Sequence, residues 1–259
     1  MEIHTTVSRG HSISYEDHGA GKALVLIPGL GSPAREWTDR GYLESLAARF
    51  RVIVVDPLGH GESTVSADPD DYLDPDVGED VVAAMDAAGV DRAAVWGYSR
   101  GSMLAATVAA EHPERVEALV LGGFSMLSGS DPDYTVSAPT QALLDGDWHG
   151  AFDAWAAGGM DLSESDRQYM IDYSHPQGVA GSQIGHRRSG YMPDLSRISR
   201  PVLVYYASGD IADDPEPAEF CTRLGTLPVV LPGEHDHAEG FNDAPAVLPI
   251  VLEFLERQD

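Results

Sequence analysis

The sequence contains a single cysteine, Cys221, among 259 residues. A disulfide within the chain therefore cannot form, and a zinc or iron–sulfur site built from several cysteines is excluded. This cysteine usage is typical of reducing compartments, and we expect a cytoplasmic protein. Long hydrophobic runs are lacking as well, because no apolar stretch approaches the roughly 18 residues of a membrane-spanning helix. The first ten residues lack the apolar stretch of a signal peptide, and we expect none. We expect no membrane association.

Basic residues are the second scarcity. Only 16 lysine and arginine residues oppose 42 aspartate and glutamate residues, which gives a formal net charge of −26, and Lys22 is the one lysine. Such a field repels polyanions, and the longest basic run is Arg187-Arg188, so nucleic-acid binding is not expected. The acidity fits solubility with a coding bias or, alternatively, adaptation to high salt.

Short apolar runs bounded by turn residues recur along the chain. Their hydrophobicity is continuous rather than alternating, which indicates strands buried on both faces of a parallel sheet. The runs are Ala23–Ile27, Val52–Val55, Ala93–Trp96, Leu119–Leu121, Val202–Tyr206 and Val229–Leu231. Helical patterns lie between the first four, over Trp37–Arg49, Val77–Ala88 and Ser102–His112. This order predicts an α/β fold with right-handed crossovers, and the alternating segments 2–7 and 11–17 predict an antiparallel hairpin at the sheet edge.

The strand pattern stops between residues 124 and 199. Helical pieces over 140–144, 148–156 and 164–173 are separated there by glycine, proline and serine. A structureless loop of this length is uncommon in a compact domain, so we predict a helical lid at 124–199, inserted into a core formed by residues 1–123 and 200–259. Trp148, Trp155 and Tyr191 of this segment are candidates for substrate contacts, although most such aromatic residues pack a lid's own core.

The segment Gly97-Tyr98-Ser99-Arg100-Gly101 matches G-x-S-x-G, the pattern of a nucleophile elbow. With 27 glycines in the chain the match alone is weak, but a buried strand precedes it and a helix follows it. Such a tight turn holds a serine hydroxyl out of the sheet at the positive end of a helix, and the flanking glycines avoid collisions within the turn. Ser99 is therefore the predicted nucleophile.

An activated serine also needs a base and an orienting acid. The strand that ends at residue 206 runs into Asp210, with Asp213 and Asp214 close behind as alternatives. The loop after the last strand carries His235 and His237, and both lie at the edge of the sheet where Asp210 is expected. The chain order serine, aspartate, histidine is typical of this strand–turn–helix architecture.

An oxyanion hole completes the expected machinery. The loop Pro28-Gly29-Leu30-Gly31 follows the first buried strand and can aim a backbone amide at Ser99. Arg100, directly after the serine, supplies a second amide.

With these segments the chain resembles the α/β-hydrolase family, in its lid-bearing esterase, lactonase and C–C hydrolase branch. The likeness covers nearly the whole chain and rests on four motifs, which are the Pro28–Gly31 loop, the segment Asp56-Pro57-Leu58-Gly59-His60-Gly61-Glu62-Ser63, the elbow, and the histidine loop Gly233–Phe241. Pro28 stands where the family often has histidine, and the histidine loop is one residue longer than usual.

The resemblance implies a role for each candidate residue. The amides of Leu30 and Arg100 hold the oxyanion, Ser99 is the nucleophile and Asp210 the acid. Of the two histidines we favour His237, because Phe241 follows it by four residues as in the family pattern, while His235 stays the alternative. His60 and Asp56 are interpreted as structural.

An acyl-serine intermediate requires a carbonyl substrate, and a serine at the elbow argues against haloalkane or epoxide hydrolysis, for which the family uses aspartate. We therefore expect a serine hydrolase that acts on a small or medium apolar ester or lactone without a cofactor or metal. A C–C bond hydrolase, lyase or cyclase of secondary metabolism with the same triad is the alternative, and a non-catalytic small-molecule receptor is the third interpretation. The sequence leaves the substrate and homo-oligomerisation open.

Overall fold

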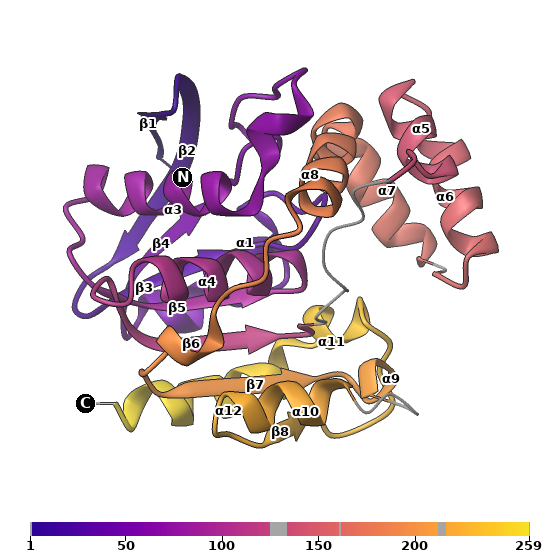
Figure 1. Cartoon of the computed structure of the whole chain (residues 1–259). Helices are drawn as coiled ribbons and strands as arrows, with labels where there is room; N and C mark the ends of the chain where they lie inside the picture. The colour runs from indigo at the N-terminus through magenta and orange to yellow at the C-terminus, as the bar shows by residue number, and fades with distance from the viewer. Residues whose placement is uncertain (1, 125–133, 161, 212–215, 259) are drawn as a thin grey trace.

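The centre of the computed structural model is an eight-stranded sheet within the described residues, which are 2–124, 134–160, 162–211 and 216–258 (Figure 1). The strand order is β1-β2-β4-β3-β5-β6-β7-β8. The first two strands pair antiparallel and β2 pairs antiparallel with β4, whereas all later pairs are parallel. The predicted, mostly parallel sheet with an edge hairpin is confirmed. The strands are β1 Ile3–Ser8, β2 His11–Gly19, β3 Ala23–Ile27, β4 Arg51–Val55, β5 Ala93–Tyr98, β6 Val116–Gly122, β7 Val202–Tyr206 and β8 Pro228–Val230.

Helices cover both faces of this sheet. Side chains of α3, α4 and α10 pack in one buried cluster with Val25 and Ile27 of β3, and those of α1, α2, α11 and α12 pack in a second cluster with Leu24 and Leu26. Alternate residues of β3 thus enter opposite layers, which explains why its apolar run is continuous. The helices are α1 Glu36–Asp39, α2 Leu43–Ala47, α3 Asp74–Ala87, α4 Arg100–Glu111, α9 Ser208–Ile211, α10 Glu216–Arg223, α11 Glu239–Asn242 and α12 Ala244–Glu256, with 3-10 turns at Pro69–Tyr72 and Leu195–Arg197.

The single helix predicted over residues 37–49 is wrong. The structure has α1 and α2 instead, separated by Gly41, whose φ of 88° lies in the left-handed region. The N–H of Gly41 donates to the Thr38 carbonyl at 3.0 Å and that of Tyr42 to the Trp37 carbonyl at 2.9 Å, which is the Schellman pattern that ends a helix. Trp37 and Tyr42 are both buried and meet edge to face, 5.1 Å between ring centroids. The apolar residues of this segment therefore belong to two short helices, which pack in the same buried cluster.

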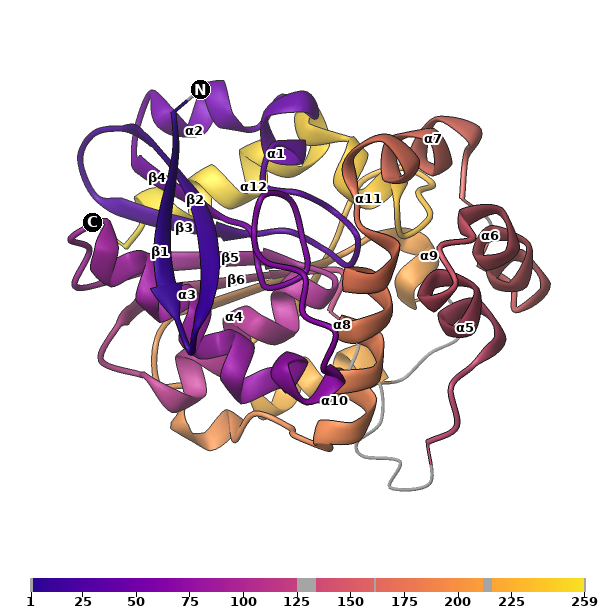
Figure 2. The ribbon, with the colours of Figure 1, turned by 90° about the horizontal axis from the view of Figure 1, so that it is seen from above.

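Between β6 and β7 the described residues form helices and no strand. They are α5 Ala138–Leu144, α6 Trp148–Ala157, α7 Glu164–Tyr173 and α8 Pro176–Ser189, and Figures 1 and 2 show α5, α6 and α7 grouped together to one side of the sheet, with α8 between them and the rest. The three predicted helical pieces are confirmed, whereas α8 was not predicted. The division into a core and a lid stays a prediction. Within the described part of the chain, no helix has the length and hydrophobicity to cross a membrane.

Helix α8 could not be predicted from the sequence pattern, because glycines interrupt its apolar face. A Cβ atom at Gly178 would lie 2.0 Å from the Gly59 carbonyl oxygen, and one at Gly181 would lie 2.5 Å from the ring of Tyr72. Both positions thus have to be glycine for α8 to approach the loop after β4 this closely.

Candidate active site

Ser99 occupies the sharp turn between β5 and α4. Its backbone has φ 52° and ψ −120°, a conformation that costs free energy in a residue with a Cβ and that is concentrated at functional sites. Its N–H donates to the Gly122 carbonyl at 2.8 Å, which fastens the turn to β6. The strand–turn–helix context predicted for the motif is the one observed.

His237 and Asp210 lie beside this serine. His237 Nε2 is 2.8 Å from Ser99 Oγ, and His237 Nδ1 is 2.7 Å from Asp210 Oδ1. The second oxygen of Asp210 accepts a hydrogen bond from the Ala207 N–H at 3.2 Å. The Asp210 side chain is 13% exposed and that of His237 47%. With Nδ1–H donating to the carboxylate, Nε2 is free to accept the serine proton.

His235, the alternative base, makes other contacts. Its Nε2 is 3.1 Å from Asp243 Oδ2, and its backbone N–H donates to Ser208 Oγ at 3.0 Å. These contacts attach the histidine loop to α9 and α12, away from Ser99. The alternative acids Asp213 and Asp214 lie outside the described residues.

Tyr98, inside the elbow itself, holds the histidine loop in place. Its hydroxyl donates to the His237 carbonyl at 2.5 Å, and the two rings lie 5.4 Å apart. Burial raises the pKa of Tyr98 well above its ordinary value, so the phenol stays a neutral donor. Sequence reasoning missed this residue, although its place between Gly97 and Ser99 fixes it next to the nucleophile.

The two residues whose amides are expected to hold an oxyanion border Ser99. Arg100 is the first residue of α4, so its N–H has no acceptor within the helix. A Cβ atom at Gly29 would lie only 3.5 Å from Ser99 Cβ, which places the loop that contains Leu30 directly beside the serine.

Comparison with known proteins identifies the family. A family model described as alpha/beta hydrolase fold matches residues 22–170, more than half of the chain. The chain belongs to the α/β-hydrolase family.

Several known proteins resemble this α/β-hydrolase. A curated protein of Azorhizobium caulinodans, provisionally named a carbamate hydrolase, is 36% identical over 116 residues, or 44% of this chain and 42% of that protein. The 2-hydroxymuconate semialdehyde hydrolase of Pseudomonas sp. strain CF600 is 36% identical over 123 residues, or 47% and 43%. The chain thus matches less than half the length of these relatives. The crystal structure of an enol-lactonase from Burkholderia xenovorans superposes with a TM-score of 0.81 at 23% identity, covering 97% of this chain and 99% of that one, and shows the same fold.

Trp148 and Trp155 pack in a small aromatic cluster of the helical segment. Each is 8% exposed, and they flank Phe152, which is 3% exposed. The ring of Trp148 stacks on Phe152 with 5.5 Å between centroids. Leu30, from the loop beside Ser99, packs against the same cluster. Both tryptophans thus contribute to the segment's own core, and that core borders the loop next to the nucleophile.

Tyr191 is not brought to the site. Its hydroxyl donates to Glu111 Oε1 at 2.6 Å, and Glu111 is the last residue of α4, about 16 Å along the helix from the end next to Ser99. Burial and this carboxylate raise the pKa of Tyr191. Tyr191 is therefore not part of the substrate site that we propose.

The two residues interpreted as structural connect loops. Asp56 accepts hydrogen bonds from the Ala34 N–H at 2.5 Å, the Ser14 hydroxyl at 2.6 Å and the Glu62 N–H at 3.1 Å, so it joins the loops after β3 and β4. His60 is buried with Nδ1 3.1 Å from the Leu58 carbonyl, and burial lowers its pKa to about 4.

The side chain of Arg100 is anchored away from the nucleophile. Asp74 at the start of α3 is fully buried and receives the Arg100 guanidinium, His186 Nδ1 at 2.8 Å and the Ser189 hydroxyl at 3.1 Å. Burial by itself raises the pKa of Asp74, but Arg100 and His186 outweigh it and hold that pKa below its ordinary value. This cluster fastens α3, α4 and α8 to one another.

Asp74→Asn should lower the free energy of unfolding by about 2 kcal/mol at pH 7, because it weakens charged hydrogen bonds in a buried site. Since folding lowers the pKa of Asp74, its stabilisation is present at neutral pH and is lost as the pH falls below the ordinary value of 3.8. The difference between the variant and wild type should therefore shrink in acid. Urea titrations of wild type and variant at pH 7 and at a pH below 3.8 measure this difference in the free energy of unfolding. The control is Asp86→Asn, because Asp86 lies on the same helix and forms an exposed ion pair with Arg115. This variant should lose no more than about 0.5 kcal/mol of the free energy of unfolding. Equal losses in the two variants would contradict the stabilising role of Asp74.

Proposed function

We propose that this α/β-hydrolase is a serine hydrolase that forms an acyl-enzyme on Ser99. The observation that carries the proposal is the continuous chain of hydrogen bonds from the Ser99 hydroxyl through His237 to Asp210. It lies at the carboxyl ends of parallel strands, where ligands bind in open α/β sheets, and at the positive N-terminus of α4.

The geometry supports acyl transfer in two stages. His237 Nε2 takes the proton of the Ser99 hydroxyl as its oxygen forms a bond to the substrate carbonyl carbon. The amides of Leu30 and Arg100 hold the resulting oxyanion. Collapse of this intermediate breaks the bond to the alcohol, which leaves with the proton from His237. A water molecule then gives a proton to the same histidine and attacks the acyl group, and Ser99 regains its proton as the carboxylic acid departs.

A small or medium apolar ester or lactone suits this site best. Leu30, in the loop next to Ser99, packs against an aromatic cluster, and apolar surroundings of this kind favour apolar acyl or alkyl groups. The relatives are named for carbonyl chemistry, including the carbamate hydrolase and the enol-lactonase. The mechanism needs no cofactor.

C–C bond hydrolysis is the second candidate. It is favoured by the 36% identity to the 2-hydroxymuconate semialdehyde hydrolase over 123 residues. Intact-mass detection of an acylated Ser99 after mixing with an ester supports ester hydrolysis. Turnover of a β-diketone without any ester-derived acyl-enzyme supports C–C hydrolysis instead.

A fluorophosphonate probe tests the reactivity of Ser99 without knowledge of the substrate. Native protein should gain the mass of one probe, located at Ser99 by peptide mapping, because the probe reacts with an activated serine. Ser99→Ala should gain none, and Ser45→Ala, which removes a hydroxyl on α2, should react like wild type. A folded wild-type protein that stays unlabelled would contradict the proposal and favour a small-molecule receptor.

A further inference from the structure

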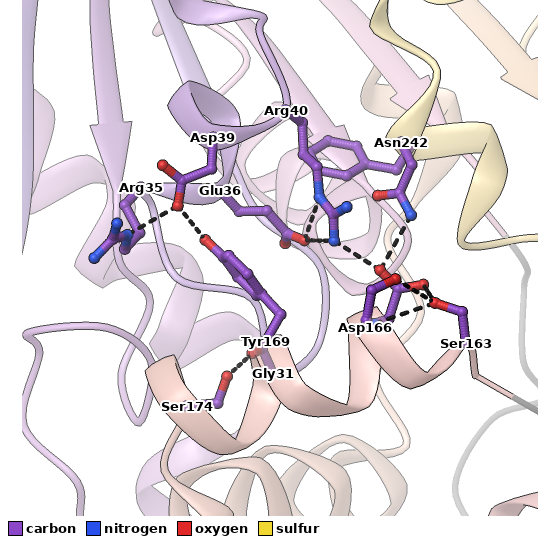
Figure 3. A network of polar contacts seen from close by, with 12 residues as sticks. Gly31, Arg35, Glu36, Asp39, Arg40, Ser163, Asp166, Tyr169, Ser174 and Asn242 are labelled. Atoms are coloured by element: carbon purple, nitrogen blue, oxygen red, sulfur yellow. Dashed lines mark hydrogen bonds and ion pairs between the residues drawn. The ribbon is translucent and has the colours of Figure 1, made fainter.

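Helix α7 has no fully buried side chain, although Met170 and Ile171 pack, partly buried, against the aromatic cluster. Helices α5, α6 and α8, by contrast, each bury two or more side chains. Figure 3 shows α7 joined by polar contacts to α1 and to the loop that precedes α1. Because α7 buries little apolar surface, its position depends to a large extent on a few polar contacts.

Asp166, near the start of α7, lies where three elements meet. Its Oδ1 accepts hydrogen bonds from Arg40 Nη2 at 2.7 Å and from Asn242 Nδ2 at 3.2 Å, and its Oδ2 accepts one from the Ser163 hydroxyl at 2.6 Å. Arg40 caps α1, which follows the loop with Leu30, and Asn242 ends α11, which begins two residues after His237. The Asp166 side chain is only 14% exposed. One carboxylate thus connects α7 to the ends of α1 and α11 (Figure 3).

Other residues at and just after α7 contact α1 and the loop that precedes it. The Tyr169 hydroxyl donates to Asp39 Oδ2 at 2.9 Å, and the Ser174 hydroxyl, just after the helix, donates to the Gly31 carbonyl. The methyl group of Met170 lies so close to Gly31 that a Cβ atom there would be 2.5 Å from it. Met170 and Ser174 therefore contact the loop whose amide is expected to hold the oxyanion.

Arg40 is preset to receive Asp166. Glu36, one turn earlier on α1, binds it at 3.3 Å from Nε and 3.2 Å from Nη2. Glu36 is buried, and its hydrogen bonds hold the Arg40 guanidinium close to α1. Nη2 of Arg40 can then also donate to Asp166 on α7. The carboxylate of Asp166 then meets a fixed cation rather than a mobile one, which lowers the entropy cost of docking.

We infer that Asp166 is a positioning residue, which docks α7 on α1 and α11 and so keeps the two loops that lead into these helices in place beside Ser99. The inference rests on the proposed function, because those loops carry Leu30 and His237. A displacement of about 1 Å in such groups slows a reaction by up to about 100-fold.

Asp166→Asn is the decisive variant, because it keeps the shape of the side chain and removes its charge. We expect kcat toward a short-chain aryl ester, and the rate of fluorophosphonate labelling, to fall about 10- to 100-fold, with KM changed less than about threefold. Hydrogen–deuterium exchange should rise in α7 and in segments 29–32 and 237–242. Asp172→Asn is the matched control, because Asp172 lies on the same helix, is exposed, and bonds to Gln168 at 2.8 Å. It should behave like wild type in every measurement.

The outcomes separate this inference from the proposed function. If wild type reacts with the probe but Asp166→Asn matches Asp172→Asn in kcat, labelling and exchange, the inference is wrong and the proposed function stands. If wild type is unreactive, the proposed function is wrong, and the inference falls with it. Asp166→Glu, which restores the charge, should recover part of kcat. Should Asp166→Asn fail to fold, Asn242→Ala removes one of the same contacts, and a kcat equal to that of Asp172→Asn then overturns the inference.

Discussion

Replacing His237 with alanine should lower kcat/KM toward a short-chain aryl ester by at least about 10⁴-fold. Without this imidazole, 2.8 Å from Ser99 Oγ, the serine has to attack as a neutral hydroxyl, and the leaving alcohol has no proton donor. The side chain is 47% exposed, so its removal should leave the fold intact. Steady-state kinetics with a circular-dichroism check measure the effect.

Two further variants make the result specific to the histidine. Residues that act as one unit are not additive, so the double variant Ser99→Ala/His237→Ala should be no slower than the slower single variant. His235→Ala should keep kcat/KM within about tenfold of wild type, since it loses a contact to Asp243 and none to the nucleophile. A His237→Ala enzyme that retains most of its activity, or a His235→Ala enzyme that loses it, would contradict the assignment.

The strands could be predicted because their environment leaves a simple pattern. Each parallel strand is covered on both faces, so its residues are apolar without interruption, as in β3. Helix boundaries depend on single residues with special backbone conformations. Gly41 ends α1 in a segment whose apolar spacing continues through it, and the glycines of α8 replace the apolar stripe that would reveal a helix. These features are decided by close approach in the folded chain, which spacing does not encode.

The same distinction applies to the site. Ser99, Asp210 and the two candidate histidines follow parallel strands, and the ends of such strands meet at one edge of the sheet. Local context therefore predicted that they lie together, while the family resemblance favoured His237 over His235. Asp166 and Arg40 are 126 positions apart and meet only through the packing of α7 on α1. Tyr191 illustrates the opposite case, because its aromatic character suggested a ligand contact while its partner is Glu111. Residue type selects candidates, and tertiary placement decides among them.

The glycines of the elbow should tolerate a methyl group poorly. A Cβ atom at Gly101 would lie 2.2 Å from the Ile27 carbonyl oxygen and 2.5 Å from that of Pro28. Both are backbone atoms next to the loop with Leu30, so no side chain can rotate away to relieve the clash. Gly101→Ala should therefore force α4 and β3 apart and lower the free energy of unfolding by more than about 4 kcal/mol.

Gly10→Ala separates this clash from the general cost of losing a glycine. Gly10 has φ 87° in the turn of the edge hairpin, and nothing lies within 4 Å of its Cβ position, so alanine there meets backbone strain alone, about 1–2 kcal/mol. Urea unfolding of both variants gives the comparison, with soluble yield as the readout if Gly101→Ala does not fold. A Gly101→Ala protein as stable as Gly10→Ala would mean that the start of α4 can shift away from β3. In that case the approach of the loop to Ser99 would be adjustable, and the amides of Leu30 and Arg100 would not be held in a fixed arrangement around the nucleophile.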